Sequence, residues 1–190
     1  MKTQTIIALK FLAVMTLLTG ILYPLLMTGV AQIIFPAKAN GSLIMKDGKI
    51  IGSALIGQKF DSTIYFWSRP SSVDYNPIPS GASNFGPTSK ALLKQVTDRR
   101  ALFAGKNGVA DTFSIPKEMI FASASGLDPD ISPKAALMQV ERVAKARNFS
   151  ADKKQKLLKC IKELTVAPQF LCLGEERINV LALNIELDKL

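Results

Sequence analysis

The segment from Phe11 to Phe35, FLAVMTLLTGILYPLLMTGVAQIIF, contains twenty-five residues and no charged side chain. As a helix rising ~1.5 Å per residue it is ~37 Å long, more than the ~30 Å hydrocarbon core of a bilayer. Residues 11–36 are therefore predicted to form a transmembrane helix. A short segment at residues 1–10 precedes it, and one soluble domain at residues 40–190 follows.

A cleaved signal peptide is the alternative interpretation of this apolar run. Lys2 and Lys10 precede it, and Ala37-Lys38-Ala39 has the small-x-small pattern of a cleavage site. The apolar part of a signal peptide has only about 7 to 15 residues, however. The length of the run therefore favours an uncleaved anchor.

Small and polar side chains recur every four residues inside the run, at Thr16, Gly20, Pro24, Thr28 and Gln32. Stripes of small residues let helix backbones approach closely, and polar side chains can hydrogen-bond across the contact. We expect this stripe to be a docking face for other transmembrane helices. Alternatively, Pro24 merely kinks the helix, and a threonine covers the carbonyl that the proline leaves free.

The remaining chain has the composition of one globular domain with a basic balance. The whole chain has 24 basic residues, 15 acidic residues, two cysteines and no histidine. The lysines between Lys153 and Lys162 are interpreted as the solvated face of a helix, with a membrane surface as the best anionic partner. Nucleic acid binding is not expected, because the basic residues are not interleaved with aromatic ones. Cys160 and Cys172 could pair outside the cytoplasm or remain reduced, and both alternatives stay open.

Turn signals and apolar runs predict the elements of the domain. A hairpin is expected at residues 42–56 around Asp47-Gly48, and a strand at residues 64–67. Four prolines and two glycines predict a long loop over residues 68–88. Such long loops are usually functional or disordered, and the aromatic residues here favour packed order.

Three helices and two further strands are expected after this loop. Prolines in first turns and serine caps predict the helices, which are residues 87–103, residues 133–147 with Ser132 as the cap, and the lysine-rich segment from Ser150 to Pro168. The predicted strands are residues 169–173 and 178–185, whereas residues 115–121 are ambiguous. The order of strands, helices and strands indicates one mixed α/β domain of the α+β class.

The residues expected of an enzyme are not evident in the sequence. Without histidine, the commonest general base and metal ligand near neutral pH are missing. No phosphate-binding G-x-x-x-x-G-K-S/T pattern occurs, and no Asp-Lys-Thr-Gly-Thr segment of the kind that P-type ATPases phosphorylate. We expect no ATP hydrolysis by this chain alone, and no metal site.

Two loops carry weak ligand signals. Asp128 and Asp130 could surround a hard cation with Ser125, although the remaining spacing of a calcium loop is missing. The segment from Ser80 to Pro87 could hold an anion through backbone amides near a helix start. In both cases a structural turn is the favoured interpretation.

Four ordered sequence blocks stand out: Tyr65-Phe66-Trp67-Ser68-Arg69-Pro70-Ser71, Tyr75-Asn76-Pro77 with residues 80–88, residues 122–133, and residues 174–184. With these blocks the chain resembles, over nearly its whole length, the C subunit family of the bacterial Kdp potassium-transporting ATPase, the KdpC family. Their candidate partner-contact or structural residues are Arg69, Pro70, Tyr75, Asn76, Ser80, Gly81, Ser83, Asn84, Gly86, Ser125, Gly126, Asp128, Pro129, Arg177 and Asn179.

The resemblance implies a noncatalytic subunit of an ATP-driven potassium uptake complex in the bacterial inner membrane. The implied partners are the channel-like subunit KdpA, the P-type ATPase subunit KdpB, the small helical subunit KdpF and membrane lipid. Potassium and ATP with magnesium would belong to the complex, and no cofactor is assigned to this chain. The implied role is assembly and stability, together with a catalytic-chaperone effect that raises the ATP affinity of the P-type subunit.

The resemblance also implies a single pass, with a cytoplasmic N-terminus and an extracytoplasmic domain. This topology argues against direct contact between the domain and ATP, because ATP is cytoplasmic. Two other classes of protein are alternatives to such a subunit. A membrane-anchored enzyme would need a nucleophile and a base, and no such pair is visible. A stand-alone membrane-anchored extracytoplasmic binding module would be stable without partners and would bind a small ligand.

Overall fold

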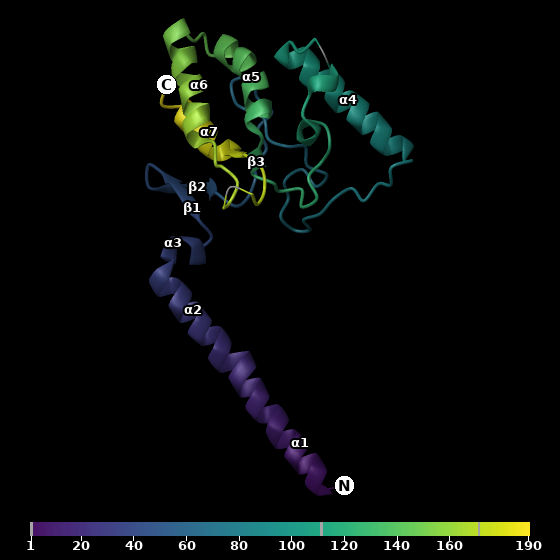
Figure 1. Ribbon diagram of the computed structural model, residues 1–190, viewed down its shortest axis with the longest axis vertical. Helices are drawn as coiled ribbons and strands as arrows, with labels where there is room; N and C mark the ends of the chain where they lie inside the picture. Colours follow the sequence, from purple (N-terminus) through teal and green to yellow (C-terminus); the bar gives the residue numbers. More distant parts are fainter. Residues whose placement is uncertain (1, 111, 171) are drawn as a thin grey trace. The chain divides into compact units, whose positions relative to one another are not determined.

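The computed structural model of the protein describes residues 2–110, 112–170 and 172–190 (Figure 1). The chain divides into an N-terminal unit that ends at Ile51 and a second unit from Gly52 to Leu190. A long apolar helix in the first unit is followed by mixed helix and strand, which confirms the predicted α+β class.

The apolar run forms one continuous helix from Lys2 to Ile34, long and apolar enough to cross a membrane. It consists of α1 (Lys2–Met15), a π-helical turn η1 (Thr16–Leu22) and α2 (Tyr23–Ile34). The helix thus begins nine residues before Phe11 and ends before residue 36. A separate turn, α3 (Pro36–Ala39), begins at Pro36, because the backbone of Phe35 leaves the helical region.

Pro24 accounts for the irregular turn in the middle of this helix. Proline has no backbone N–H, so the carbonyl four residues earlier, at Gly20, loses its usual partner. The preceding turn is π-helical. The amide of Tyr23, the residue directly after it, donates to the Leu18 carbonyl. The Thr28 hydroxyl donates to the Pro24 carbonyl at 2.8 Å, so it is not the hydrogen-bond donor to the Gly20 carbonyl.

The predicted hairpin is confirmed by β1 (Leu43–Lys46) and β2 (Lys49–Ser53), which form a two-stranded sheet. Its turn residues Asp47 and Gly48 both have positive φ, at 52° and 74°. This conformation suits an Asp-Gly pair in a two-residue turn, because its twist matches that of the strands.

The second unit contains four helices among the residues described, each with a capping side chain. They are α4 (Lys90–Asn107), α5 (Pro133–Ala146), α6 (Ala151–Leu164) and α7 (Val180–Leu187). The hydroxyls of Ser89, Ser132 and Ser150 and the amide oxygen of Asn179 accept from the backbone N–H three residues on, which fixes each start. The caps predicted at Ser132 and Ser150 are confirmed. The first helix starts after Ser89 rather than at Pro87.

The core lies where α5, α6 and α7 meet a two-stranded antiparallel sheet of β3 (Asp130–Ile131) and β4 (Ile178–Asn179). In Figure 1, α5 lies between α6 and α4. Two 3-10 turns, η2 (Thr112–Ser114) and η3 (Lys117–Met119), follow α4, so residues 115–121 form neither a strand nor an α-helix. Fully buried core side chains are Phe66, Val143, Leu157, Ile178, Val180, Leu183 and Leu187.

The strand predicted at residues 64–67 is wrong, because side-chain amides replace a neighbouring strand. The Phe66 N–H donates to Asn184 Oδ1 at 2.8 Å, and Asn184 Nδ2 donates back to the Phe66 carbonyl at 3.0 Å. The Trp67 N–H donates to Gln139 Oε1 at 2.7 Å, and Gln139 Nε2 donates to the Trp67 carbonyl at 3.3 Å. The backbone of Phe66 and Trp67 is thereby hydrogen-bonded to side chains without joining a sheet.

The two late strand predictions are also wrong in extent. Only Ile178 and Asn179 form a strand, because the Asn179 side chain caps α7 and the following apolar residues are buried as a helix. The segment from Gln169 to Leu173 makes one isolated bridge between its ends and closes as a tight turn, and residue 171 lies outside the described residues. The loop predicted over residues 68–88 is confirmed, since no helix or strand forms there.

Candidate functional site

The first and third motif blocks meet at an ion pair. Arg69 Nη1 lies 2.6 Å from Asp128 Oδ2, and both side chains are about three-quarters buried, with exposed fractions of 26% and 29%. The Ser123 N–H donates to the Pro70 carbonyl at 3.0 Å beside it. The Tyr75 hydroxyl donates to the Arg69 carbonyl, which brings the second block into the same cluster.

The second and third blocks are also joined through backbone. The Gly81 N–H donates to the Ser125 carbonyl at 2.9 Å, and the Ser72 hydroxyl donates to the Gly81 carbonyl at 2.7 Å. Gly126 is buried here at a φ of +71°, and a Cβ on it would lie 2.5 Å from Val73 Cγ2. No other residue fits that position without displacing the neighbouring loop.

Asp130 connects the third block to the fourth. Its carboxylate lies 3.2 Å from Arg177 Nε, and its backbone pairs with Asn179 across the β3–β4 sheet. Burial, and then the neighbouring charge of Asp128, raise the pKa of Asp130. The Val180 N–H donates to the Pro129 carbonyl at 2.9 Å, which holds the start of α7 against this loop.

These contacts favour the structural interpretation of both weak ligand loops. Asp128 and Asp130 each face an arginine rather than a shared cation position. Across residues 2–110, 112–170 and 172–190, no group of three or more histidine, cysteine, aspartate or glutamate residues could hold a metal ion. In the loop from Ser80 to Pro87, the Gly81 amide is already bonded to Ser125.

The remaining predicted loop residues do not join the ion-paired cluster. Asn76 Oδ1 accepts from the Ile78 N–H at 3.0 Å and forms a local turn. The Gly86 carbonyl accepts from the Ser89 N–H at the start of α4. Ser80 and Asn84 are exposed, Asn84 with a φ of 53°, and Ser83 is half-buried. These residues shape the loop and its entry into α4.

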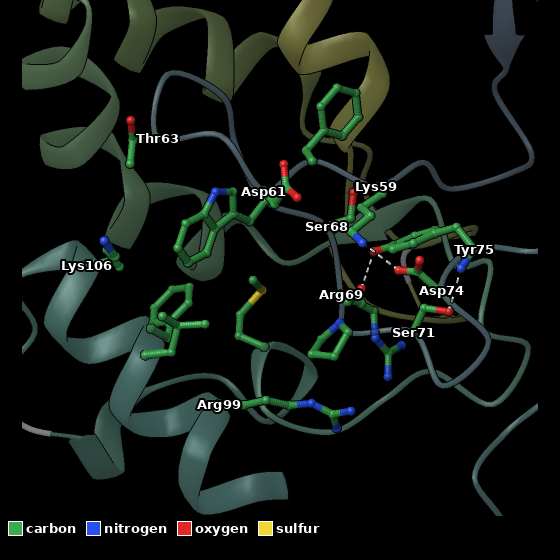
Figure 2. A pocket seen from close by; sticks show the side chains of 16 residues that line it. Lys59, Asp61, Thr63, Ser68, Arg69, Ser71, Asp74, Tyr75, Arg99 and Lys106 are labelled. Carbon is green, nitrogen blue, oxygen red and sulfur yellow. Dashed lines mark hydrogen bonds and ion pairs between the residues drawn. The ribbon is translucent and has the colours of Figure 1, made fainter.

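A cavity of about 380 Å³ lies between the first two motif blocks and one face of α4 (Figure 2). Arg69, Pro70, Ser71 and Tyr75 line it from the loop, and burial raises the pKa of the Tyr75 hydroxyl. The helix and the turn after it contribute Arg99, Leu102, Phe103, Lys106 and Met119. The sequence indicated the loop side, whereas no motif marked the α4 side.

A buried arginine supports the segment that leads into the loop. Arg142 on α5 is 7% exposed and donates to the Thr63 carbonyl at 2.6 Å and to Asn107 Oδ1 at 2.9 Å. Its guanidinium carbon lies 4.3 Å from the centre of the Trp67 ring. Burial lowers the pKa of Arg142 to about 10, so the group remains charged at neutral pH. No sequence signal distinguished it from other helix arginines.

Comparison with known proteins identifies the family. The model for "K+-transporting ATPase, c chain", KdpC, matches residues 5–189. The chain belongs to the KdpC family. Relatives named "Potassium-transporting ATPase KdpC subunit" include one from Burkholderia vietnamiensis, 48% identical over 99% of this chain and 97% of its own length. Another, from Methylococcus capsulatus, is 49% identical over 96% of both chains. A third, from Bradyrhizobium diazoefficiens, is 47% identical over 96% of this chain and 94% of its own.

Membership of the KdpC family confirms the resemblance that the four blocks indicated. In this KdpC-family chain Arg69 contacts Asp128, fifty-nine positions away, and Asp130 contacts Arg177, forty-seven positions away. The blocks therefore form one continuous structure that fixes the long loop on the helices. Contact between the blocks and partner subunits remains a prediction.

Proposed function

We propose that this chain is the noncatalytic accessory subunit of an ATP-driven potassium uptake complex, required for assembly and stability. Membership of the KdpC family supports the proposal. The partners proposed are KdpA, KdpB and KdpF, with the P-type subunit KdpB carrying out ATP hydrolysis.

The N-terminal helix carries this proposal. From Lys2 to Ile34 it is strongly apolar, yet none of its residues is buried in the structure. Leu17, Leu25 and Ile33 are 58%, 67% and 83% exposed. Lipid can cover such a surface, and small residues along one stripe let a partner helix approach. The helix is thus suited to both anchoring and docking.

Co-purification from native membranes tests the assembly role. The tagged full chain would be extracted from its native membrane in a mild detergent, and the recovered proteins would be identified by mass spectrometry. We expect a channel-like potassium-binding protein and a P-type ATPase in fixed ratio with the chain. Recovery of the chain alone, from a membrane that contains both proteins, would contradict the proposal.

The second unit is proposed to lie on the extracytoplasmic side of the inner membrane, with the N-terminus in the cytoplasm. On that topology an effect on ATP affinity passes through the transmembrane helix, because the folded domain and ATP are on opposite sides. A photoactivatable ATP analogue, applied to the intact complex, tests this point. We expect crosslinks in the P-type subunit, and crosslinks within residues 52–190 of this chain would reverse the assignment.

A further inference from the structure

The cavity beside α4 has the size and walls of a small-molecule site. Its volume of about 380 Å³ is much larger than the voids that ordinary packing leaves, and it falls in the range of ligand pockets. Most of the exposed surface of the cavity is apolar, and Phe60, Trp67, Leu102, Phe103 and Met119 are among the residues that line it. Phe103 and Met119 are buried, whereas Leu102 is 55% exposed at the edge. An apolar group bound there would contact these side chains.

Only some of the positively charged residues around this cavity have a carboxylate partner. Lys59 Nζ lies 2.8 Å from Asp74 Oδ1, and Arg69 lies 2.6 Å from Asp128, so two of the four cations have carboxylate partners. The remaining acidic residue, Asp61, is exposed and raises the pKa of Lys59, after the larger effect of Asp74. Lys59 and Asp61 come from the segment before Trp67, and Asp74 comes from the loop after it; all three are labelled in Figure 2.

Arg99 and Lys106 supply the unmatched positive charge. They lie seven residues apart on α4, which places them on one helix face. Neither forms an ion pair with any residue that the structure describes. The Arg99 guanidinium is part-buried, and the hydrogen bond assigned to it is a long one, 3.4 Å to the Ile120 carbonyl. Burial lowers the pKa of Arg99 with no opposing carboxylate. Such a cation is stabilised by an anion that reaches it.

We propose that this cavity binds a small monoanionic amphiphile, with its carboxylate on Arg99 and its apolar chain against Trp67, Phe103 and Met119. One negative charge matches the site, because the Lys59–Asp74 and Arg69–Asp128 pairs are each neutral overall and Asp61 offsets one of the two remaining cations. The apolar walls require a hydrocarbon body, which free phosphate and acetate lack. This binding role does not depend on the transport function, and it is tested on the chain alone.

The fluorescence of Trp67 reports directly on ligand binding in the cavity, because Trp67 is the only tryptophan in the chain and it lines the cavity. The full chain would be placed in nanodiscs of phosphatidylcholine and titrated with bromooctanoate, whose bromine quenches indole fluorescence on contact. We expect saturable quenching. A linear, unsaturable decrease would show partition into lipid only and would overturn the proposal.

Matched variants separate this site from nonspecific binding. Arg99→Gln should weaken bromooctanoate binding about tenfold, because a charge-assisted hydrogen bond is lost. Lys94→Gln, at an exposed position on the same helix away from the cavity, should bind as the unchanged chain does. Equal affinities in the unchanged chain and in Arg99→Gln would contradict the assignment of the anion to Arg99.

Two further binding experiments, one with a neutral ligand and one with a charged variant, test whether the ligand must carry a negative charge. Bromooctanamide, which has the same chain without the charge, should bind about tenfold more weakly. Leu102→Asp places a carboxylate at the exposed edge, so it should weaken bromooctanoate binding without unfolding the domain. Equal binding of the amide, or complete competition by inorganic phosphate or ATP at equal concentration, would refute a monoanionic amphiphile site.

Discussion

Arg69 and Asp128, fifty-nine positions apart in the chain, form an ion pair of 2.6 Å that joins the loop after Trp67 to the loop before α5. Both side chains are largely covered by protein, so the pair is less screened than a surface ion pair. The Tyr75 hydroxyl and the Ser123 amide also hold the carbonyls of Arg69 and Pro70 in place. The pair therefore holds the cavity wall in place.

Asp128→Asn should lower the free energy of unfolding by about 1–2 kcal/mol, since a charge-assisted hydrogen bond is replaced by a neutral one. Denaturant unfolding of the full chain, followed by Trp67 fluorescence, measures the change. Asp98→Asn, at an exposed position on α4, is the matched control and should have little effect. A double-mutant cycle with Arg69→Gln should show coupling, and simple additivity would contradict a direct interaction.

Gly126→Ala should destabilise the second unit by about 2–4 kcal/mol, because a Cβ there adds steric overlap to an unfavourable positive φ. The added atom would lie 2.9 Å from the Gly81 carbonyl oxygen as well as 2.5 Å from Val73 Cγ2. Gly105→Ala is an informative control, because no atom lies within 4 Å of its added Cβ and the site is inside α4. That change should stabilise the helix by about 0.5–1 kcal/mol. A shift of the thermal unfolding midpoint in the same direction for both variants would contradict the structure.

Gly20→Leu should reduce the amount of partner protein recovered with the chain, because a bulky side chain would block close helix approach. The helix itself accepts a side chain here, since the nearest atom to an added Cβ is Thr16 Cγ2 at 3.9 Å. Gly29→Leu is the matched control: it lies in the same helix, outside the stripe, and no atom is within 4 Å of its added Cβ. Quantitative mass spectrometry of the recovered complex measures the difference. Equal recovery with both variants would reject the stripe as a docking face.

Cys172 should react with a membrane-impermeant maleimide on intact, outer-membrane-permeabilised cells if the second unit is extracytoplasmic. Cys172 is exposed, whereas Cys160 is half-buried and burial raises the pKa of its thiol, which slows reaction. Both thiols are free in the structure. Labelling should therefore survive Cys160→Ser and be largely lost in Cys172→Ser. Labelling only after the inner membrane is broken would place the domain in the cytoplasm.

Arg142→Lys should destabilise the second unit by about 2–4 kcal/mol, although the charge is retained, because lysine cannot reproduce the planar set of donors or the stacking on Trp67. The carbonyls of Thr63 and Tyr65 would lose donors now at 2.6 and 2.9 Å. Lys145→Arg, at an exposed site on the same helix, is the control and should be nearly neutral. Unfolding midpoints, and the emission of Trp67, give the two measurements. Equal stability of both variants would contradict the role assigned to the buried guanidinium.

Part of the candidate site could be predicted because its residues stand in recognisable blocks. Arg69, Tyr75, Gly126 and Asp128 were selected in this way, and the structure brings them together. Arg99 and Lys106 were not, since a charged residue on a helix has the same sequence pattern whether it faces solvent or a cavity. Only the packing of the loop against α4 distinguishes these positions.

The sequence by itself determined the features that depend on neighbouring residues. An uncharged run forms a long apolar helix, an Asp-Gly pair closes a hairpin, and serines such as Ser132 and Ser150 begin helices, because each depends on local backbone and solvation energies. The tertiary structure decided how Phe66 and Trp67 satisfy their backbone groups. Their partners, Asn184 and Gln139, are 118 and 72 residues away, and a side-chain amide can donate to and accept from the backbone as a neighbouring strand would. Apolar alternation cannot separate these two outcomes, because both bury the same side chains.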